Sequence, residues 1–220
     1  MFTAVAFVPV APVLVLGPPG AVEPVDAAVA RALAPIAAAG LPVHLLVAAP
    51  EPGAAEFTFA GLGAVPDDLA GSAVGPDTAD LPWRVGVAEA LIGRHGLRSG
   101  HVQELRPGAP LGEPKESACL VVAADGSAKR SDSAPGSLDP RAEAFDAGVL
   151  AALGQADPVG LASLDAELGT QLLADGVHVW RSLGVALRDR SWHSAVAAEL
   201  NAPFGVGYLT GAWVVQGSRS

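Results

Sequence analysis

Three predominantly hydrophobic runs in this sequence have the length of buried β-strands. They cover residues 3–8, 41–49 and 117–124, and the first two end at a proline. Runs without polar alternation are typical of parallel strands that are covered by helices on both faces. A closing strand is expected over 205–215, where apolar residues return near the end of the sequence.

Apolar residues at helical spacing predict helices between and after these strands. The clearest helix covers 23–39: its first turn is acidic, its apolar residues share one face, and Gly40 follows as a stop. The other expected helices are 82–94, 140–153, 158–174 in one or two pieces, 177–188 and 191–200. This order predicts an α/β fold. We expect a three-layer sandwich with a central, mostly parallel or mixed sheet, helices on both faces and a helix-rich C-terminal half.

Length and charge narrow the classes of protein that fit. The 220 residues, half of them hydrophobic, suit a single domain over 1–220, and no repeat or linker divides them. The net charge of −10 repels phosphate groups, so we expect neither nucleic acid nor an anionic membrane as a partner. A small-molecule ligand is compatible with this charge, as is a homodimer, for which the apolar segment around Trp213 is a candidate contact.

The apolar N-terminal segment and the lone cysteine both favour a cytoplasmic protein. The segment 1–16 has no basic residue and is interrupted by prolines, which argues against a secretory signal or a membrane span. Cys119 lies within a buried-strand pattern, where a thiol is inert, and one cysteine forms no internal disulfide. We therefore expect a cytoplasmic location.

Ligands of parallel α/β sheets bind beyond the carboxyl ends of the strands. In this sequence those ends lead to Pro9 and Val10, to the segment 49–51 and to the polar loop 124–132. Within that loop, a serine and a lysine two residues apart can act as nucleophile and base, and the next arginine can hold an anion. The alternative is a solvated loop with local side-chain-to-backbone bonds.

The histidines and glycine-rich segments give no recognisable cofactor motif. No pair of histidines has the spacing that presents two nitrogens to a metal from one helix or strand. The histidines are His44, His95, His101, His178 and His193. The segment 205–211 does not have the spacing of a dinucleotide-binding loop, and its glycines indicate turns or tight packing.

Two longer motifs are more informative: D-P-R-x-x-x-F-D at 139–146 and P-F-G-V-G-Y at 203–208. Together with 8–12, 125–136 and 164–168, they resemble the superfamily of class III extradiol ring-cleavage dioxygenases, in an actinobacterial branch. The resemblance implies an α/β sandwich. In active members it also implies a mononuclear Fe(II) held by two histidines and a glutamate.

The same resemblance places those iron ligands at positions where this sequence has other residues. The first histidine corresponds to Val10, and the second falls near Pro50 or Glu51. The glutamate falls near Ala174, with Asp175 beside it. Two carboxylates without a histidine are a poor Fe(II) set and would suit Mg²⁺ or Ca²⁺ better.

A further family histidine, the acid/base of a Ser-His step, corresponds to Ala128 after Ser127. We therefore predict no iron and no other cofactor. The candidate cleft consists of Pro9, Val10, Glu51, Asp125, Ser127, Ala128, Lys129, Arg130 and Asp175.

Three functional hypotheses follow. The first is a non-catalytic protein that keeps the fold and binds a small molecule or a partner. The second is a metal-independent enzyme that uses the loop Asp125–Arg130, and it requires those side chains to meet. The third is an iron dioxygenase with displaced ligands, drawn for example from His178, His44 or His101, and it requires three such groups to converge.

Overall fold

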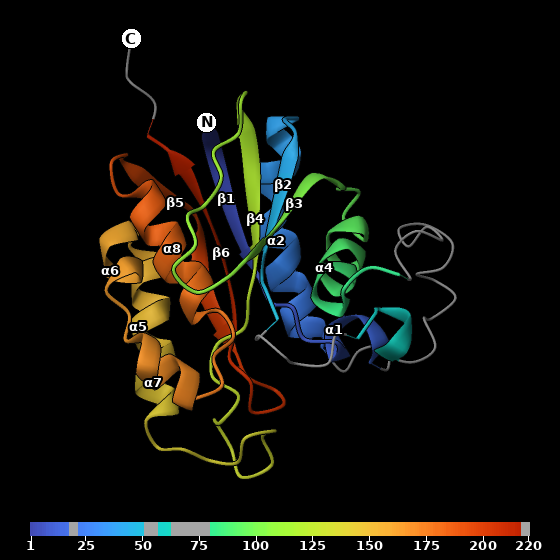
Figure 1. Cartoon of the computed structure of the whole chain (residues 1–220), viewed down its shortest axis with the longest axis vertical. Helices are drawn as coiled ribbons and strands as arrows, with labels where there is room; N and C mark the ends of the chain where they lie inside the picture. Colours follow the sequence, from blue (N-terminus) through green and yellow to red (C-terminus); the bar gives the residue numbers. More distant parts are fainter. Residues whose placement is uncertain (18–21, 51–56, 63–79, 217–220) are drawn as a thin grey trace.

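The computed structural model describes residues 1–17, 22–50, 57–62 and 80–216. The described residues form a mixed six-stranded sheet in the order β3-β2-β4-β1-β6-β5 (Figure 1). The strands are β1 (Phe2–Val8), β2 (Val43–Ala48), β3 (Ser99–Leu105), β4 (Ala118–Ala123), β5 (Trp192–Asn201) and β6 (Tyr208–Val215). Strands β3, β2, β4 and β1 are parallel, whereas β6 and β5 are antiparallel additions at one edge. Strands from both halves of the sequence thus meet at the pairing of β1 with β6.

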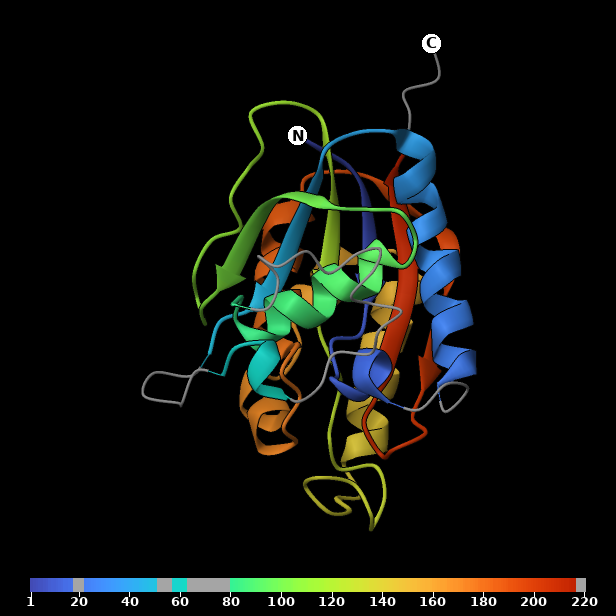
Figure 2. The same cartoon turned by 90° about the vertical axis from the view of Figure 1, so that its right-hand side faces the viewer.

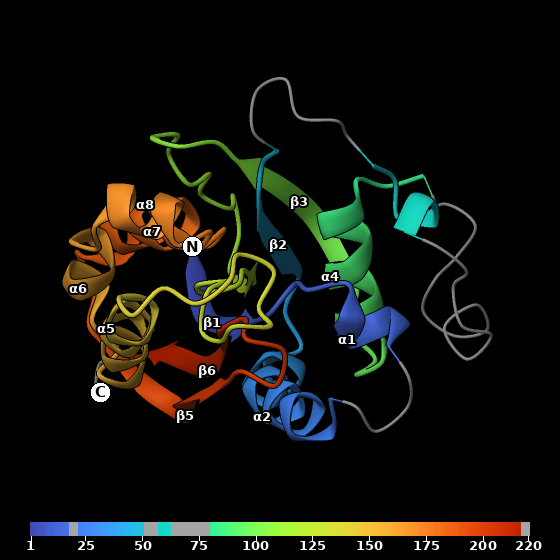
Figure 3. The same cartoon turned by 90° about the horizontal axis from the view of Figure 1, so that it is seen from below.

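Helices cover both faces of the sheet, which gives the expected three layers (Figures 1 and 3). On one face lie α5 (Ala142–Gly154), α6 (Pro158–Ala162), α7 (Ala166–Gln171) and α8 (Val177–Leu187). On the other face lie α1 (Val13–Leu16), α2 (Glu23–Ala39) and α4 (Trp83–Gly93), and a 3₁₀ turn, η1 (Ala60–Leu62), packs beside α4. Figure 2 shows this second face.

The strands are apolar on both sides because each face packs against helices. In β4, Leu120 and Val122 belong to the core under α5–α8, whereas Cys119 and Val121 belong to the core under α1, α2 and α4. Cys119 is fully buried, and burial raises the pKa of its thiol. This cysteine therefore behaves as a small core residue.

The segment 191–200 is a strand and not a helix, so the prediction there was wrong. Its alanines favour a helix, but it forms the ten-residue strand β5, which pairs antiparallel with β6. Trp192 anchors it: the side chain is buried near Trp213, with 6.3 Å between ring centroids, and its Nε1 donates to the carbonyl of Leu187 at 3.1 Å. Cross-strand packing here outweighs helix propensity, which is a weak local preference.

Strand β3 was not predicted from the sequence. It is an edge strand of mostly polar or small residues, most of them exposed, so it lacks the apolar run that marks the inner strands. Its carboxyl end at Leu105 is buried, and Ala49 donates its backbone N–H to the Leu105 carbonyl at 3.0 Å. This edge therefore brings the chain after β3 close to the chain after β2.

Trp213, the proposed centre of a dimer contact, is buried within the chain itself. Its ring packs against Phe7 at 4.9 Å between centroids, and its Nε1 donates to the carbonyl of Leu153 at 2.7 Å. This side chain serves the core, and a homodimer remains a prediction without an assigned surface.

None of the helices in the described part of the chain combines the length and the apolar character needed to cross a lipid bilayer.

Candidate functional site

The chain segments that follow β1 and β4 are joined at the carboxyl edge of the sheet. The backbone N–H of Val10 donates to Asp125 Oδ1 at 3.0 Å. Pro9 and Val10 are buried, and Asp125 is partly buried. Three of the residues expected at the cleft therefore do meet, although Val10 contributes its backbone and not its side chain.

Asp125 lies in an environment that disfavours its ionised form. Burial raises the pKa of this carboxyl to about 7, and the nearby carboxylate of Asp175 adds to the rise. The bond from Val10 and the charge of Arg84 act in the opposite direction. Tyr208 is buried close by, and burial together with Asp125 raises the pKa of its phenol. Near neutral pH, Asp125 is consequently present in both protonated and ionised forms.

Arg84, at the start of α4, reaches across the carboxyl edge to the segment before α8. Its Nη2 forms an ion pair with Asp175 Oδ2. The guanidinium also stacks on the ring of Trp83, with its Cζ 4.3 Å from the ring centroid. Its Nε is buried and has no hydrogen-bond partner among the described residues. The guanidinium is thus held in place from two sides while a donor remains unused.

A cavity of about 290 Å³ opens beside this ion pair. Most of its wall is apolar, and its polar side chains come from Arg84, Thr170, Asp175 and His178. The lining residues are Ala48, Ala49, Arg84, Leu105, Pro107, Thr170, Leu173, Ala174, Asp175, Val177 and His178. The volume and the few polar groups are typical of a small-molecule site.

The second half of the predicted loop belongs to a separate buried cluster. Ser127 is fully buried, and its hydroxyl donates to Asp146 Oδ2 at 2.7 Å while its backbone N–H donates to Oδ1 at 2.8 Å. Arg130 Nη1 lies 3.1 Å from the same Oδ2. The nucleophile-and-base hypothesis required the Ser127 hydroxyl to contact Lys129. The hydroxyl instead bonds to the carboxylate of Asp146.

Backbone bonds fix the rest of this loop against the segment before β6. Gly126 donates to the carbonyl of Gly207 at 2.7 Å, and Gly207 donates to that of Ser127 at 2.8 Å. A Cβ atom on either glycine would come within 2.7 Å of an Asp146 carboxylate oxygen. Gly207 is therefore needed for close packing around Asp146, in line with the tight packing that the sequence indicated for the 205–211 segment.

Ala128 and Lys129 add no chemistry to the cleft. Ala128 donates its backbone N–H to the carbonyl of Leu172 at 3.0 Å, and the Lys129 side chain lies against Gly136. Glu51, the remaining cleft residue expected from the sequence, lies outside the described residues.

The described residues do not fit a mononuclear Fe(II). Val10 and Ala174 carry no ligating side chain, and Asp175 is paired with Arg84. No group of three His, Cys, Asp or Glu side chains in the described ranges is arranged to hold a metal ion. These observations give no support to a triad at the family positions.

The histidines considered as displaced ligands lie at opposite ends of the sheet. His44 and His101 pair near the amino ends of β2 and β3, with 4.8 Å between ring centroids. His178 lines the cavity next to Ala48, four residues further along β2, which is roughly 13 Å at the rise of a strand. The three imidazoles do not converge on one ion.

Three residues of this region escaped sequence reasoning: Arg84, Asp146 and Tyr208. The last two lie inside the motifs at 139–146 and 203–208, so those motifs mark the position of the cluster without revealing its contacts. Arg84 had a weaker signal, since it is the second residue of α4, a helix that the sequence predicts over 82–94.

Comparison of the sequence with protein-family models and with curated proteins found no match.

Proposed function

We propose that this protein binds a small organic acid in the 290 Å³ cavity, on a fold similar to that of the class III extradiol dioxygenases and without their iron. The observation that carries the proposal is the position of Arg84 in the cavity wall. Its guanidinium is always charged and is oriented by Asp175 and Trp83. Such a group binds a carboxylate well.

The rest of the cavity suits the carbon skeleton of such an acid. Its apolar wall comes from Ala48, Ala49, Leu105 and Ala174. The wall carries one guanidinium that already pairs with the Asp175 carboxylate, which favours a monoanion over a polyanion.

The test is a screen of aliphatic and aromatic carboxylic acids by saturation-transfer difference NMR, with the primary amide of each acid as its control. We expect acids to bind better than their amides, and the Arg84→Gln variant to weaken acid binding at least about tenfold through loss of a charge-assisted hydrogen bond. Arg31→Gln is the matched control, since Arg31 forms an exposed ion pair with Glu199 on another face. Equal binding by wild type and Arg84→Gln would contradict the proposal.

Iron loading separates this proposal from ring cleavage. After anaerobic incubation with Fe(II) and gel filtration, we expect mass spectrometry of the metal content to find far less than one iron per chain, because Val10 and Ala174 offer no ligand. One tightly held iron per chain would contradict the proposal and make catechols the first substrates to try.

Asp125 supports a second candidate function, metal-independent acid–base catalysis. A carboxyl that titrates near pH 7 can both accept and donate a proton at physiological pH. The same NMR samples test this second function. If a bound acid is slowly converted by wild type but not by Asp125→Asn, and the variant still binds the acid, the protein is an enzyme and not only a binding protein.

A further inference from the structure

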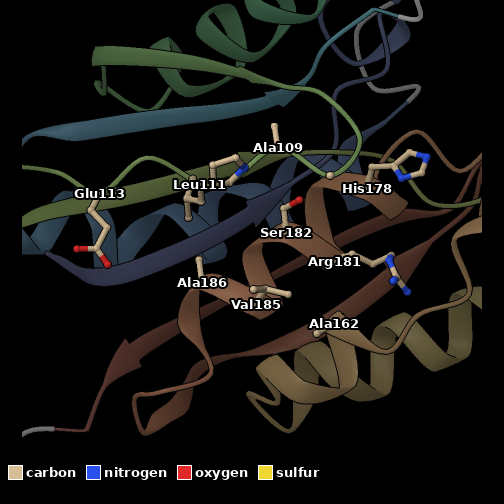
Figure 4. Close-up of a pocket in the computed structure, with 11 residues that line it drawn as sticks. Ala109, Leu111, Glu113, Ala162, His178, Arg181, Ser182, Val185 and Ala186 are labelled. Atoms are coloured by element: carbon tan, nitrogen blue, oxygen red, sulfur yellow. The ribbon is translucent and has the colours of Figure 1, made fainter.

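A groove extends from the proposed acid site along the length of α8. Its main part is a cavity of about 420 Å³ between one face of α8 and the strap 106–117, the segment that joins β3 to β4 (Figure 4). Glu113 lies at one end of this cavity and His178 at the other. The face of α8 that lines it consists of His178, Arg181, Ser182, Val185 and Ala186.

The groove and the acid site share a wall. His178 lines both the 290 Å³ cavity and the 420 Å³ cavity. Pro107 lines the 290 Å³ cavity and the next residue, Gly108, lines the 420 Å³ cavity. The strap therefore borders both cavities. Beyond Glu113 the groove narrows to a crevice of about 20 Å³. The geometry is that of two adjoining compartments that share His178, with a narrow crevice at the far end.

The groove is preformed, because the strap is held by contacts of its own. The side chain of Gln103 donates to the Pro110 carbonyl at 3.0 Å and accepts from the Gly112 N–H at 2.9 Å. Leu111 is buried in the core, which fixes the strap against the sheet. A ligand therefore need not order this wall when it binds.

Large apolar side chains lie exposed in both compartments. Val185 is 52% exposed in the groove, and Leu173 is 50% exposed in the acid site. Leu173 has a φ of 55° at the position where a helix end favours glycine: its N–H bonds to Thr170, and the next N–H bonds to Gly169. Leucine at this left-handed backbone position strains the backbone, but its side chain adds apolar surface to the acid site.

We propose that the groove holds the apolar tail of the acid whose carboxylate Arg84 binds, so that the ligand is a long-chain or arylalkyl monocarboxylic acid. This inference rests on the proposed function. From His178 to Val185 the helix rises about 10 Å, which sets the length of tail that the groove can take beyond the acid site. Ala109, Leu111, Val185 and Ala186 form the apolar surface for it.

The test compares butanoate with decanoate in wild type and in Val185→Trp, which fills the groove from an exposed position. We expect decanoate to bind wild type at least about tenfold more tightly than butanoate, because each buried methylene adds to affinity. Val185→Trp should remove most of that gain and leave butanoate binding unchanged. Val159→Trp, at an exposed valine on α6 outside the groove lining, should behave as wild type. Ala186→Phe blocks the same groove and guards against a folding defect specific to Val185→Trp.

The outcomes separate the two proposals. Two results would overturn this inference and leave the proposed function standing. In the first, butanoate binds in an Arg84-dependent way but decanoate binds no more tightly. In the second, the tighter binding of decanoate persists in both blocking variants. If neither acid binds wild type, the proposed function fails and the inference falls with it.

Discussion

Replacement of Asp146 by alanine is expected to destabilise the protein by roughly 3–5 kcal/mol, because it leaves buried partners of a carboxylate without their acceptor. Asp146 is fully buried and accepts from the Ser127 N–H, the Ser127 hydroxyl and Arg130. Loss of this acceptor leaves the Ser127 hydroxyl and backbone N–H without a hydrogen-bond partner in the core. It also removes the ion-pair partner of Arg130, which is largely buried. Urea unfolding followed by circular dichroism measures the change.

The matched control is Glu199→Gln, which breaks the exposed ion pair with Arg31 and should change the free energy of unfolding little. An Asp146→Ala variant as stable as this control would show that the cluster around Ser127 contributes little to the fold. A large loss of stability would instead explain Ser127 and Arg130 as structural residues of the loop after β4.

Asp125 is expected to make the protein less stable as the pH rises from about 4 to about 7. Its folded-state pKa is raised to about 7, so over this range the unfolded chain releases the proton first and the folded state holds more protons. Stability falls with increasing pH wherever the folded state binds more protons than the unfolded chain. Above the folded-state pKa of Asp125, this group no longer changes the stability with pH. Between pH 5.5 and pH 8 the loss from one such group is about 2 kcal/mol.

The Asp125→Asn variant isolates this effect, since an asparagine oxygen can still accept the bond from Val10. Urea unfolding of wild type and variant at pH 5.5 and pH 8 gives the difference. We expect the variant to gain about 2 kcal/mol over wild type between the two pH values. A constant difference would mean that Asp125 titrates outside this range.

The inner part of the fold follows from the sequence because its signals are local. The runs that form β1, β2 and β4 are apolar on both faces, and α2 begins and ends within the expected 23–39. The edges do not follow so directly. Strand β5 depends on Trp192 packing near Trp213, and β3 has one buried residue at its end, so their identity is decided by contacts with residues distant in sequence.

In the candidate site, too, local sequence signals locate some residues, and distant contacts decide the others. The carboxyl ends of the strands locate Val10 and Asp125, and the resemblance adds Asp175. The sequence treats Asp125 and Ser127 as one cluster, although the chain turns between them and directs one side chain to the cavity side and the other to Asp146. Arg84 enters the site only because α4 is placed on the second face of the sheet, which no local pattern specifies.

The most direct measurement of the central claim is a two-dimensional ¹H–¹⁵N NMR titration that follows the side-chain Nε–H signals of the arginines during addition of a bound acid. Arg84 lines the cavity, so a bound acid should change the environment of its guanidinium: the Nε–H signal should move, saturate with the affinity found in the screen and vanish in Arg84→Gln. The signal of Arg31 should stay in place. An acid that binds but shifts Arg31 or other surface signals, and leaves Arg84 unchanged, would contradict a ligand site at the carboxyl edge of the sheet.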